Sequence, residues 1–203
     1  MTGKVKKLVR KVIRDRNRVG KSDLPICFSY TENGVPEKLL SLLRSSKLVA
    51  AYMPLPDEPD ISGLLSLAAS EGAQIVYPKV DGENMDFYRG DTSGCHIEGK
   101  FGILEPIGDG TPVSASEMDL VFVPGMAFSE DGVRLGRGKG YYDKFFSGRK
   151  ESGKQACGAV LIGVCRKDRV LGRLPSDEWD LTVDAILTEE GLFMTDKQER
   201  KNG

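Results

Sequence analysis

The sequence predicts an α/β fold, in which a single domain is built on an open, mostly parallel sheet sandwiched by helices. Short apolar runs of the kind found in buried strands alternate along the chain with segments of helical periodicity. The run at 119–123, DLVFV, is closed by Pro124-Gly125, as expected for a strand covered on both faces. With 203 residues, 39% of them hydrophobic and 29% charged, the chain is long enough to bury a core.

The predicted elements follow one another in the order of a Rossmann-like fold. A proline ends one predicted strand at Pro54, and a glycine closes one predicted helix at Gly72. After an N-terminal helix, the predicted helices are 36–44, 61–70 and one that begins near Tyr141. The predicted strands are 48–53, 74–78, 85–88, 119–123, 159–165 and 183–187, with 85–88 antiparallel. The expected domain spans 1–195, and the polar tail at 196–203 is expected to be disordered.

The first 21 residues predict a basic amphipathic helix. Val5, Leu8, Val9, Val12 and Ile13 recur at helical spacing, which predicts a helix docked by this apolar stripe. The segment holds nine Lys and Arg against one acid, so its net charge is +8 and the remainder carries −9 of a total of −1. Such a pattern is typical of a solvated face, of contact with nucleic acid or an acidic membrane, or of a transit peptide.

A glycine-rich basic loop follows the strand at 119–123. Glycines at 132, 136, 138 and 140 lie among Arg134, Arg137 and Lys139. Glycine permits positive φ and lets backbone N–H groups approach a ligand, and a helix that begins near Tyr141 directs unpaired N–H groups to the same place. Phosphate suits this arrangement best. The alternative is a glycine-rich hairpin with solvated cations.

The loop differs from the two best-known phosphate loops. A Walker loop requires glycine where Val133 stands and Ser or Thr where Gly140 stands, and a dinucleotide fingerprint requires glycine where Tyr141 stands. Asp143 follows the loop closely, where an acid suits phosphate only if a metal lies between them. Mg²⁺ is the usual bridge.

Two acidic residues outside this loop are candidates for a site. The segments 52–58 and 125–141 both follow predicted strand ends, so we expect them to converge on one cleft. Glu58 lies in the first of them, where an ordinary exposed acid is the simpler interpretation. Asp184 lies among apolar residues, where an unpaired carboxylate is costly, although it can also cap a neighbouring element.

Hydropathy and cysteine spacing exclude several classes of protein. No apolar run approaches the roughly 20 residues that span a bilayer, and no basic-then-apolar leader opens the chain. Cys27, Cys95, Cys157 and Cys165 show no C-x-x-C spacing and form no metal-finger pattern with His96, which lies in a polar turn and is expected at the surface. A reduced, cytoplasmic setting is therefore expected.

The segment 124–143 resembles the signature of the 5-formyltetrahydrofolate cyclo-ligase family, also called methenyltetrahydrofolate synthetase. The signature has a Pro-Gly turn, an Ala-Phe pair, a short acidic spacer and then G-x-RLG-x-G-x-GYYD, here Pro124-Gly125, Ala127-Phe128 and 132–143. Weaker similarities lie at 6–10, 50–61, 101–106 and 174–188, in the order of the family. The resemblance therefore covers nearly the whole chain.

The resemblance implies an ATP- and Mg²⁺-dependent enzyme that converts 5-formyltetrahydrofolate into 5,10-methenyltetrahydrofolate and releases ADP and phosphate. It assigns catalysis to Arg134, Arg137, Lys139 and Tyr141, the metal to Asp143 and Asp184, and folate contacts to Met53, Glu58 and Tyr141. The residues implied for nucleotide binding are Lys6, Arg10, Arg134, Leu135, Gly136, Arg137, Gly138, Lys139, Gly140, Tyr141 and Tyr142.

The sequence departs from the family pattern at three places. Lys139 stands where members often have glycine, the segment 165–169 replaces an aromatic and an amide with charges, and Trp179 replaces the histidine of an HD pair. The last two put the pterin pocket in doubt more than the use of ATP. They leave open a non-catalytic relative that binds nucleotide or folate, and the basic helix leaves open a nucleic-acid-binding protein. We expect a cytoplasmic monomeric enzyme that binds neither nucleic acid nor a membrane.

Overall fold

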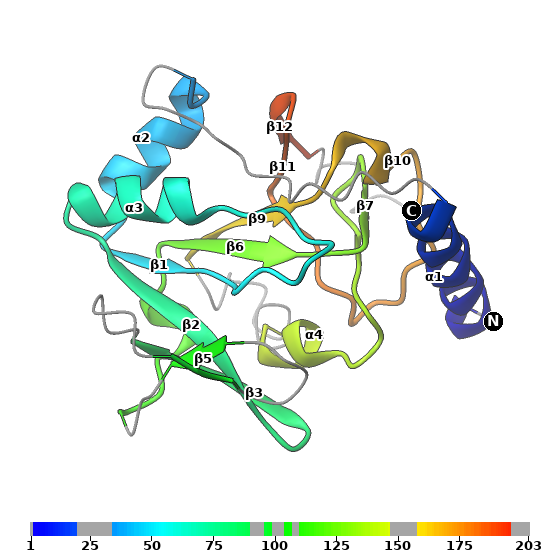
Figure 1. The fold of residues 1–203 in the computed structure, drawn as a ribbon, viewed down its shortest axis with the longest axis horizontal. Helices are drawn as coiled ribbons and strands as arrows, with labels where there is room; N and C mark the ends of the chain where they lie inside the picture. Colours follow the sequence, from blue (N-terminus) through cyan, green and yellow to red (C-terminus); the bar gives the residue numbers. More distant parts are fainter. Residues whose placement is uncertain are drawn as a thin grey trace.

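The main sheet of the protein has seven strands in the order β12-β11-β9-β6-β1-β2-β3 (Figure 1). A computed structural model describes residues 2–19, 34–89, 96–98, 104–106, 110–146 and 158–195. The inner strands are parallel, and β12 and β3 pair antiparallel at the two edges. The strands are β1 Leu48–Ala50, β2 Gln74–Asp81, β3 Asn84–Arg89, β6 Leu120–Pro124, β9 Val160–Val164, β11 Ala185–Thr188 and β12 Gly191–Met194. The predicted α/β class with a mostly parallel sheet is confirmed.

Helices cover both faces of the sheet, and the central strand β6 shows how its sequence serves both. All five residues of β6 are buried. Leu120 and Phe122 belong to the core under α2 (Glu37–Ser45) and α3 (Ser62–Ser70), whereas Val121 and Val123 belong to the core under α4 (Tyr141–Phe145). Because side chains alternate along a strand, a continuous apolar run supplies both cores. Figure 1 shows α2 and α3 on one side of the sheet and α4 on the other.

A second, three-stranded sheet carries the glycine-rich loop, and the sequence did not predict it. Its order is β10-β7-β8, with β7 at Ala127–Ser129, β8 at Arg134–Leu135 and β10 at Val170–Leu171. The loop between β8 and α4 therefore starts from a fixed strand end. The short pair β4 (His96–Glu98) and β5 (Leu104–Pro106) forms a third sheet.

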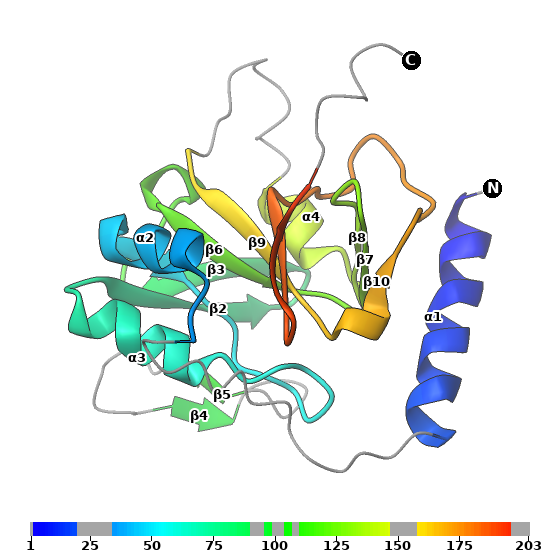
Figure 2. The same cartoon turned by 90° about the horizontal axis from the view of Figure 1, so that it is seen from above.

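The predicted N-terminal helix exists as α1 (Thr2–Val19), which stands beside the second sheet at one end of the molecule (Figure 2). The prediction that it docks by its whole apolar stripe is wrong. Val5, Leu8 and Val12 are 47%, 62% and 46% exposed, and of the stripe only Ile13 is buried while Val9 packs partly against the same cluster. The face that packs against the rest of the protein is therefore not the apolar stripe but one that includes Lys6, which is buried, and part of Arg10. Both side chains make polar contacts there, Lys6 with Asp177 and Arg10 with the Gly136 carbonyl.

The remaining boundaries differ modestly from those predicted. β1 ends at Ala50, three residues before the predicted end at Met53, because the chain leaves the sheet to line the site. β2 runs on to Asp81 through its hairpin with β3. Cys165 is buried, whereas Cys27, Cys95, Cys157, the side chain of His96 and the tail 196–203 lie outside the described residues. Among the helices in the described ranges, none combines the length and hydropathy that a membrane span requires.

Candidate active site

A cavity of about 390 Å³ lies where the loop after β1, the β2–β3 hairpin and the glycine-rich loop meet. It opens at the carboxyl ends of β1 and β6, the usual position of a site in a parallel sheet. The predicted convergence of the two loops is therefore confirmed. Its lining consists of Tyr52, Met53, Leu55, Glu58, Pro78, Val80, Met85, Pro124, Gly125, Arg134, Gly136, Arg137, Lys139, Gly140, Tyr141 and Tyr142.

One wall of the cavity is apolar, and sequence reasoning missed most of it. Leu55, Pro78, Val80 and Met85 join the predicted Met53 on this side. The hairpin that supplies Val80 and Met85 is joined to α4, because the Tyr141 hydroxyl donates a hydrogen bond to the Gly82 carbonyl at 3.1 Å. Alternation of apolar and polar residues along β2 and β3 could have indicated that these strands have two different faces. It could not have shown which face lines the cavity.

The glycine-rich loop supplies another part of the lining, and its backbone needs glycine at specific positions. Gly138 and Gly140 have φ of 104° and 72°, in the region that L side chains rarely adopt. Gly140 directly precedes the first turn of α4 in a left-handed conformation, and it lines the cavity. Lys139 between them is exposed and lines the cavity.

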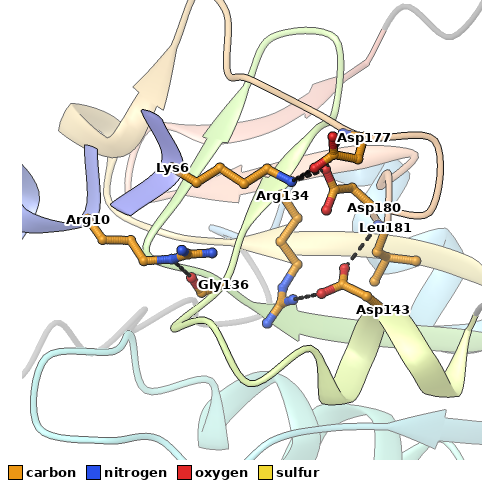
Figure 3. Close-up of polar contacts among 8 residues, drawn as sticks. All are labelled: Lys6, Arg10, Arg134, Gly136, Asp143, Asp177, Asp180 and Leu181. Carbon is orange, nitrogen blue, oxygen red and sulfur yellow. Dashed lines mark hydrogen bonds and ion pairs between the residues drawn. The ribbon is translucent and has the colours of Figure 1, made fainter. Parts of the chain in front are cut away.

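Arg134 is the most deeply held cation of the site. Its side chain is 8% exposed, and its Nε donates a hydrogen bond to the Pro124 carbonyl at 2.8 Å. Its Nη1 lies 3.8 Å from Asp143 Oδ2 (Figure 3). The guanidinium stands 4.7 Å from the centre of the Tyr142 ring. Burial lowers the pKa of Arg134, partly offset by the charge of Asp143. The same burial raises the pKa of the Tyr142 hydroxyl, so Tyr142 stays neutral.

Arg137 is paired with two carboxylates on the opposite loop. Its Nε lies 3.2 Å from Glu58 Oε1, and its Nη2 donates to Asp57. The other oxygen of Glu58 accepts a hydrogen bond from the Leu55 N–H at 3.1 Å. Burial lowers the pKa of Arg137, but Glu58 and Asp57 raise it overall. Arg137, predicted to bind phosphate, and Glu58, predicted to bind folate, therefore form an ion pair with each other.

The two predicted metal ligands have different backbone partners. Asp143 Oδ1 accepts a hydrogen bond from the Leu181 N–H at 3.0 Å, while Asp184 Oδ2 accepts one from the Leu161 N–H at 2.8 Å. Asp184 also pairs with Leu161 through its own N–H, so it caps the start of β9. Neither acid lines the cavity, and no group of three or more potential metal-ligating side chains occurs within the described part of the chain.

Lys6 and Arg10 point from α1 toward the body of the protein, as their spacing of one turn predicts (Figure 3). The Lys6 ammonium contacts the carboxylates of Asp177, at 2.8 Å, and Asp180. Arg10 Nε donates to the Gly136 carbonyl at 2.8 Å. Both residues lie outside the cavity lining, as do Leu135, which is buried beneath the loop, and Gly138.

Comparison with known proteins agrees with this architecture. The model of the 5-formyltetrahydrofolate cyclo-ligase family matches residues 2–189. The chain is 35% identical over 158 residues to the "Probable 5-formyltetrahydrofolate cyclo-ligase" of Schizosaccharomyces pombe, covering 72% of this chain and 77% of that protein. It is 30% identical over 159 residues to the 5-formyltetrahydrofolate cyclo-ligase of Mycolicibacterium smegmatis, covering 74% and 77%.

A solved structure shows the same fold. The NMR structure of the Aquifex aeolicus 5,10-methenyltetrahydrofolate synthetase superposes with a TM-score of 0.68 at 29% identity, over 95% of this chain and 94% of that chain. A match of the family model to almost the full length, with these relatives, decides the assignment. The chain belongs to the 5-formyltetrahydrofolate cyclo-ligase family.

Proposed function

We propose that this protein is an ATP- and Mg²⁺-dependent 5-formyltetrahydrofolate cyclo-ligase. The observation that carries the proposal is the cavity itself, which is lined both by a glycine-rich loop with three cations and by an apolar wall. A nucleoside triphosphate needs the first side and a flat pterin ring suits the second. The family match over residues 2–189 supports the same pairing of substrates.

The reaction needs an activated formyl oxygen. The oxygen of the N5-formyl group attacks the γ-phosphorus of ATP, the bond from that phosphorus to the β,γ-bridging oxygen breaks, and ADP leaves. The carbon of the resulting imidate-like phosphate is then attacked by N10 of the same folate, which loses its proton. The carbon–oxygen bond breaks, phosphate leaves and the five-membered ring closes. The products are 5,10-methenyltetrahydrofolate, ADP and phosphate.

The cations of the glycine-rich loop are assigned to the transferring phosphoryl group. Arg134, Arg137 and Lys139 all line the cavity, so their charges lie where negative charge spreads in the transition state. Arg134 is fixed by Pro124 and Asp143 and so needs little reorganisation. We assign Tyr141 to the junction of the two substrates, since it borders both the loop and the hairpin. Lys6 and Arg10 are assigned to the outer phosphates.

Folate is assigned to the apolar wall, with Met53 as a packing contact and Glu58 as the polar anchor. One oxygen of Glu58 is held by the Leu55 N–H, which fixes the direction of the carboxylate. The other oxygen is shared with Arg137, which therefore must yield part of its contact when the pterin binds. Such positioning holds N10 close to the formyl carbon, which favours ring closure.

Asp143 fits a role in holding Mg²⁺ together with ATP. Its Oδ2 lies 3.8 Å from Arg134, beyond hydrogen-bond distance, so this oxygen retains capacity for a cation. Protein sites usually hold Mg²⁺ with one or two carboxylates plus phosphate oxygens and water, and the bound ion neutralises phosphate charge. Asp184 fits less well, because its carboxylate caps β9.

The residues that depart from the family pattern at 165–169 and at Trp179 do not support the alternative of a non-catalytic relative. Trp179 is 61% exposed, and neither it nor any residue of 165–169 lines the cavity. The direct test mixes purified protein with 5-formyltetrahydrofolate and Mg-ATP and follows the absorbance of the methenyl product. Product that forms only with all components supports the proposal. Folded protein that binds both substrates without turnover would establish the non-catalytic alternative instead.

Lys139→Ala then tests the phosphate assignment. A charge-assisted hydrogen bond contributes about 1.5–3 kcal/mol, so the KM for ATP should rise about ten- to hundredfold while the KM for folate changes little. Lys38→Ala is the matched control, since Lys38 is exposed on α2, outside the cavity lining. Equal ATP kinetics in the two variants would remove Lys139 from the site.

A further inference from the structure

The loop 51–61, which joins β1 to α3, is closed near its base by one hydrogen bond in the interior of the protein. The Tyr52 hydroxyl donates this bond to the Pro59 carbonyl at 2.6 Å. Tyr52 is 2% exposed and belongs to the core under α2 and α3, and Pro59 is buried as well. Because a buried carbonyl without a partner is costly, the hydroxyl supplies what the Pro59 backbone needs in this place.

The outer part of the loop is a turn that is held by hydrogen bonds of its own. The Glu58 N–H donates to the Leu55 carbonyl at 2.8 Å, and the Leu55 N–H donates to Glu58 Oε2 at 3.1 Å. These two bonds fix Glu58 relative to Leu55, but they do not join the turn to the sheet. Glu58 directly precedes Pro59, so the Tyr52 hydroxyl holds the residue next to this carboxylate.

A second link between Glu58 and the rest of the protein lies in the cavity. Arg137 Nε is 3.2 Å from Glu58 Oε1, but Arg137 is assigned to phosphate, so this link is shared with a substrate. The bond from Tyr52 to Pro59 uses neither the carboxylate nor a cation of the glycine-rich loop. It can therefore hold the loop in place while both substrates are bound.

We propose that Tyr52 is a positioning residue for folate, whose hydroxyl fixes Pro59 and thereby holds the Glu58 carboxylate where the pterin binds. The proposal deepens the proposed function and rests on it, because the assignment of Glu58 to folate belongs to that function. Burial and the charge of Glu58 raise the pKa of Tyr52, so the hydroxyl keeps its proton and remains a donor. If loss of the bond leaves Glu58 correctly placed for about one tenth of the time, the apparent affinity for folate falls by the same factor.

The first experiment compares the steady-state kinetics of Tyr52→Phe with those of the wild type. Phenylalanine keeps the ring and removes only the hydroxyl. The KM for 5-formyltetrahydrofolate should rise about tenfold, with kcat and the KM for ATP within about twofold of the wild type. Tyr88→Phe is the matched control, because Tyr88 lies on β3 outside the cavity lining. The loss of one hydrogen bond should lower the melting temperature by roughly 1–6 °C, so the variant stays folded.

A double-mutant cycle then shows whether Tyr52 acts through Glu58. Glu58→Gln alone should raise the KM for 5-formyltetrahydrofolate, and Tyr52→Phe should add less than about twofold in this background. A hydroxyl that acted on folate by another route would instead multiply the KM by the same factor in both backgrounds.

Amide hydrogen exchange measures the loop without turnover. The Leu55 and Glu58 amides both donate hydrogen bonds inside the turn, so their exchange reports how often the loop opens. In Tyr52→Phe their exchange should accelerate about tenfold, while exchange of the strands β1 and β6 stays as in the wild type.

An unchanged KM for 5-formyltetrahydrofolate in folded Tyr52→Phe would overturn the proposal, and so would equal factors in the two backgrounds of the cycle. Faster exchange with unchanged folate kinetics would overturn it as well, because the hydroxyl would then support the loop without positioning the site. Equal rises in the KM for folate and for ATP would indicate a general loss of structure instead. If the wild-type protein shows no turnover, the proposed function fails, and calorimetric binding of 5-formyltetrahydrofolate replaces KM as the readout.

Discussion

The ring of Phe128 is packed between two glycines, and this arrangement predicts a large effect of a single methyl group. A Cβ atom at Gly163 would lie 2.4 Å from the Phe128 ring, and one at Gly125 would lie 2.6 Å from it. Phe128 is fully buried, so the ring has no room to swing away. Gly163 pairs with Val123 in the centre of the sheet, so its backbone cannot shift without disturbing β6 and β9.

We expect Gly163→Ala to destabilise the fold by about 1–3 kcal/mol, the usual cost of overpacking a core. For a chain of this size each kcal/mol lowers Tm by about 2–4 °C, so the melting temperature should fall by roughly 2–12 °C. Circular dichroism in urea and on heating measures both quantities. A midpoint within about 1 °C of the wild type would refute the reasoning.

The double variant Gly163→Ala/Phe128→Leu separates overpacking from other causes. Phe128→Leu should also destabilise the protein, because it leaves a cavity. Leucine removes the ring atoms that meet the new methyl group, so the two costs should fall short of additivity by about 1 kcal/mol or more. Strict additivity would mean that Gly163 matters for a reason other than the ring.

Two further predictions concern the site, and a third concerns the docking of α1. Asp143→Asn should raise the Mg²⁺ concentration for half-maximal activity about tenfold and leave the folate KM unchanged; an unaltered Mg²⁺ titration would exclude this acid. Glu58→Gln should raise the folate KM about tenfold without shifting the Mg²⁺ titration, and identical profiles for the two variants would show that the acids are misassigned. Although burial lowers the pKa of Lys6, Asp177 and Asp180 raise it overall, and the hydrogen bond from Lys6 lowers the pKa of Asp177. The pair should therefore stabilise docking of α1 fully between about pH 4 and pH 10, and lose this effect as the pH falls through the pKa of folded Asp177 or rises through that of folded Lys6. Amide exchange of α1, corrected for intrinsic rates, should accelerate below about pH 4, and equal protection at pH 3 and pH 7 would contradict this.

Local patterns predicted the elements that are long or strongly marked. The apolar run of β6 and the turn after it could be recognised because their whole signal lies within a few consecutive residues. The strands β7, β8 and β10 have only two or three residues, too few for any periodicity to appear. β7 and β8 form a short hairpin, and β10 joins it from a distant part of the chain, a pairing that sequence reading does not see.

The orientation of α1 shows the same limit more sharply. Apolar spacing predicted the correct helix but the wrong buried face. One partner of Lys6 is Asp177, 171 residues away, and no local signal marks that pair. The site prediction missed the pairing of Arg137 with Glu58 for the same reason, because these residues are 79 positions apart in the sequence. Residue types could be assigned to substrates, but their contacts with one another could not.

The Arg137–Glu58 pair gives the site a property that neither loop has alone. Each residue is assigned to a different substrate, yet in the structure the two side chains form an ion pair with each other. Phosphate that draws Arg137 away would leave Glu58 with its Leu55 contact and a freed oxygen for folate. By linkage, folate that draws Glu58 away would favour phosphate to the same extent. Asp57 also contacts Arg137, so Arg137 keeps one carboxylate partner if Glu58 moves. Under the proposed assignments, the two loops would couple the two substrates through one shared ion pair.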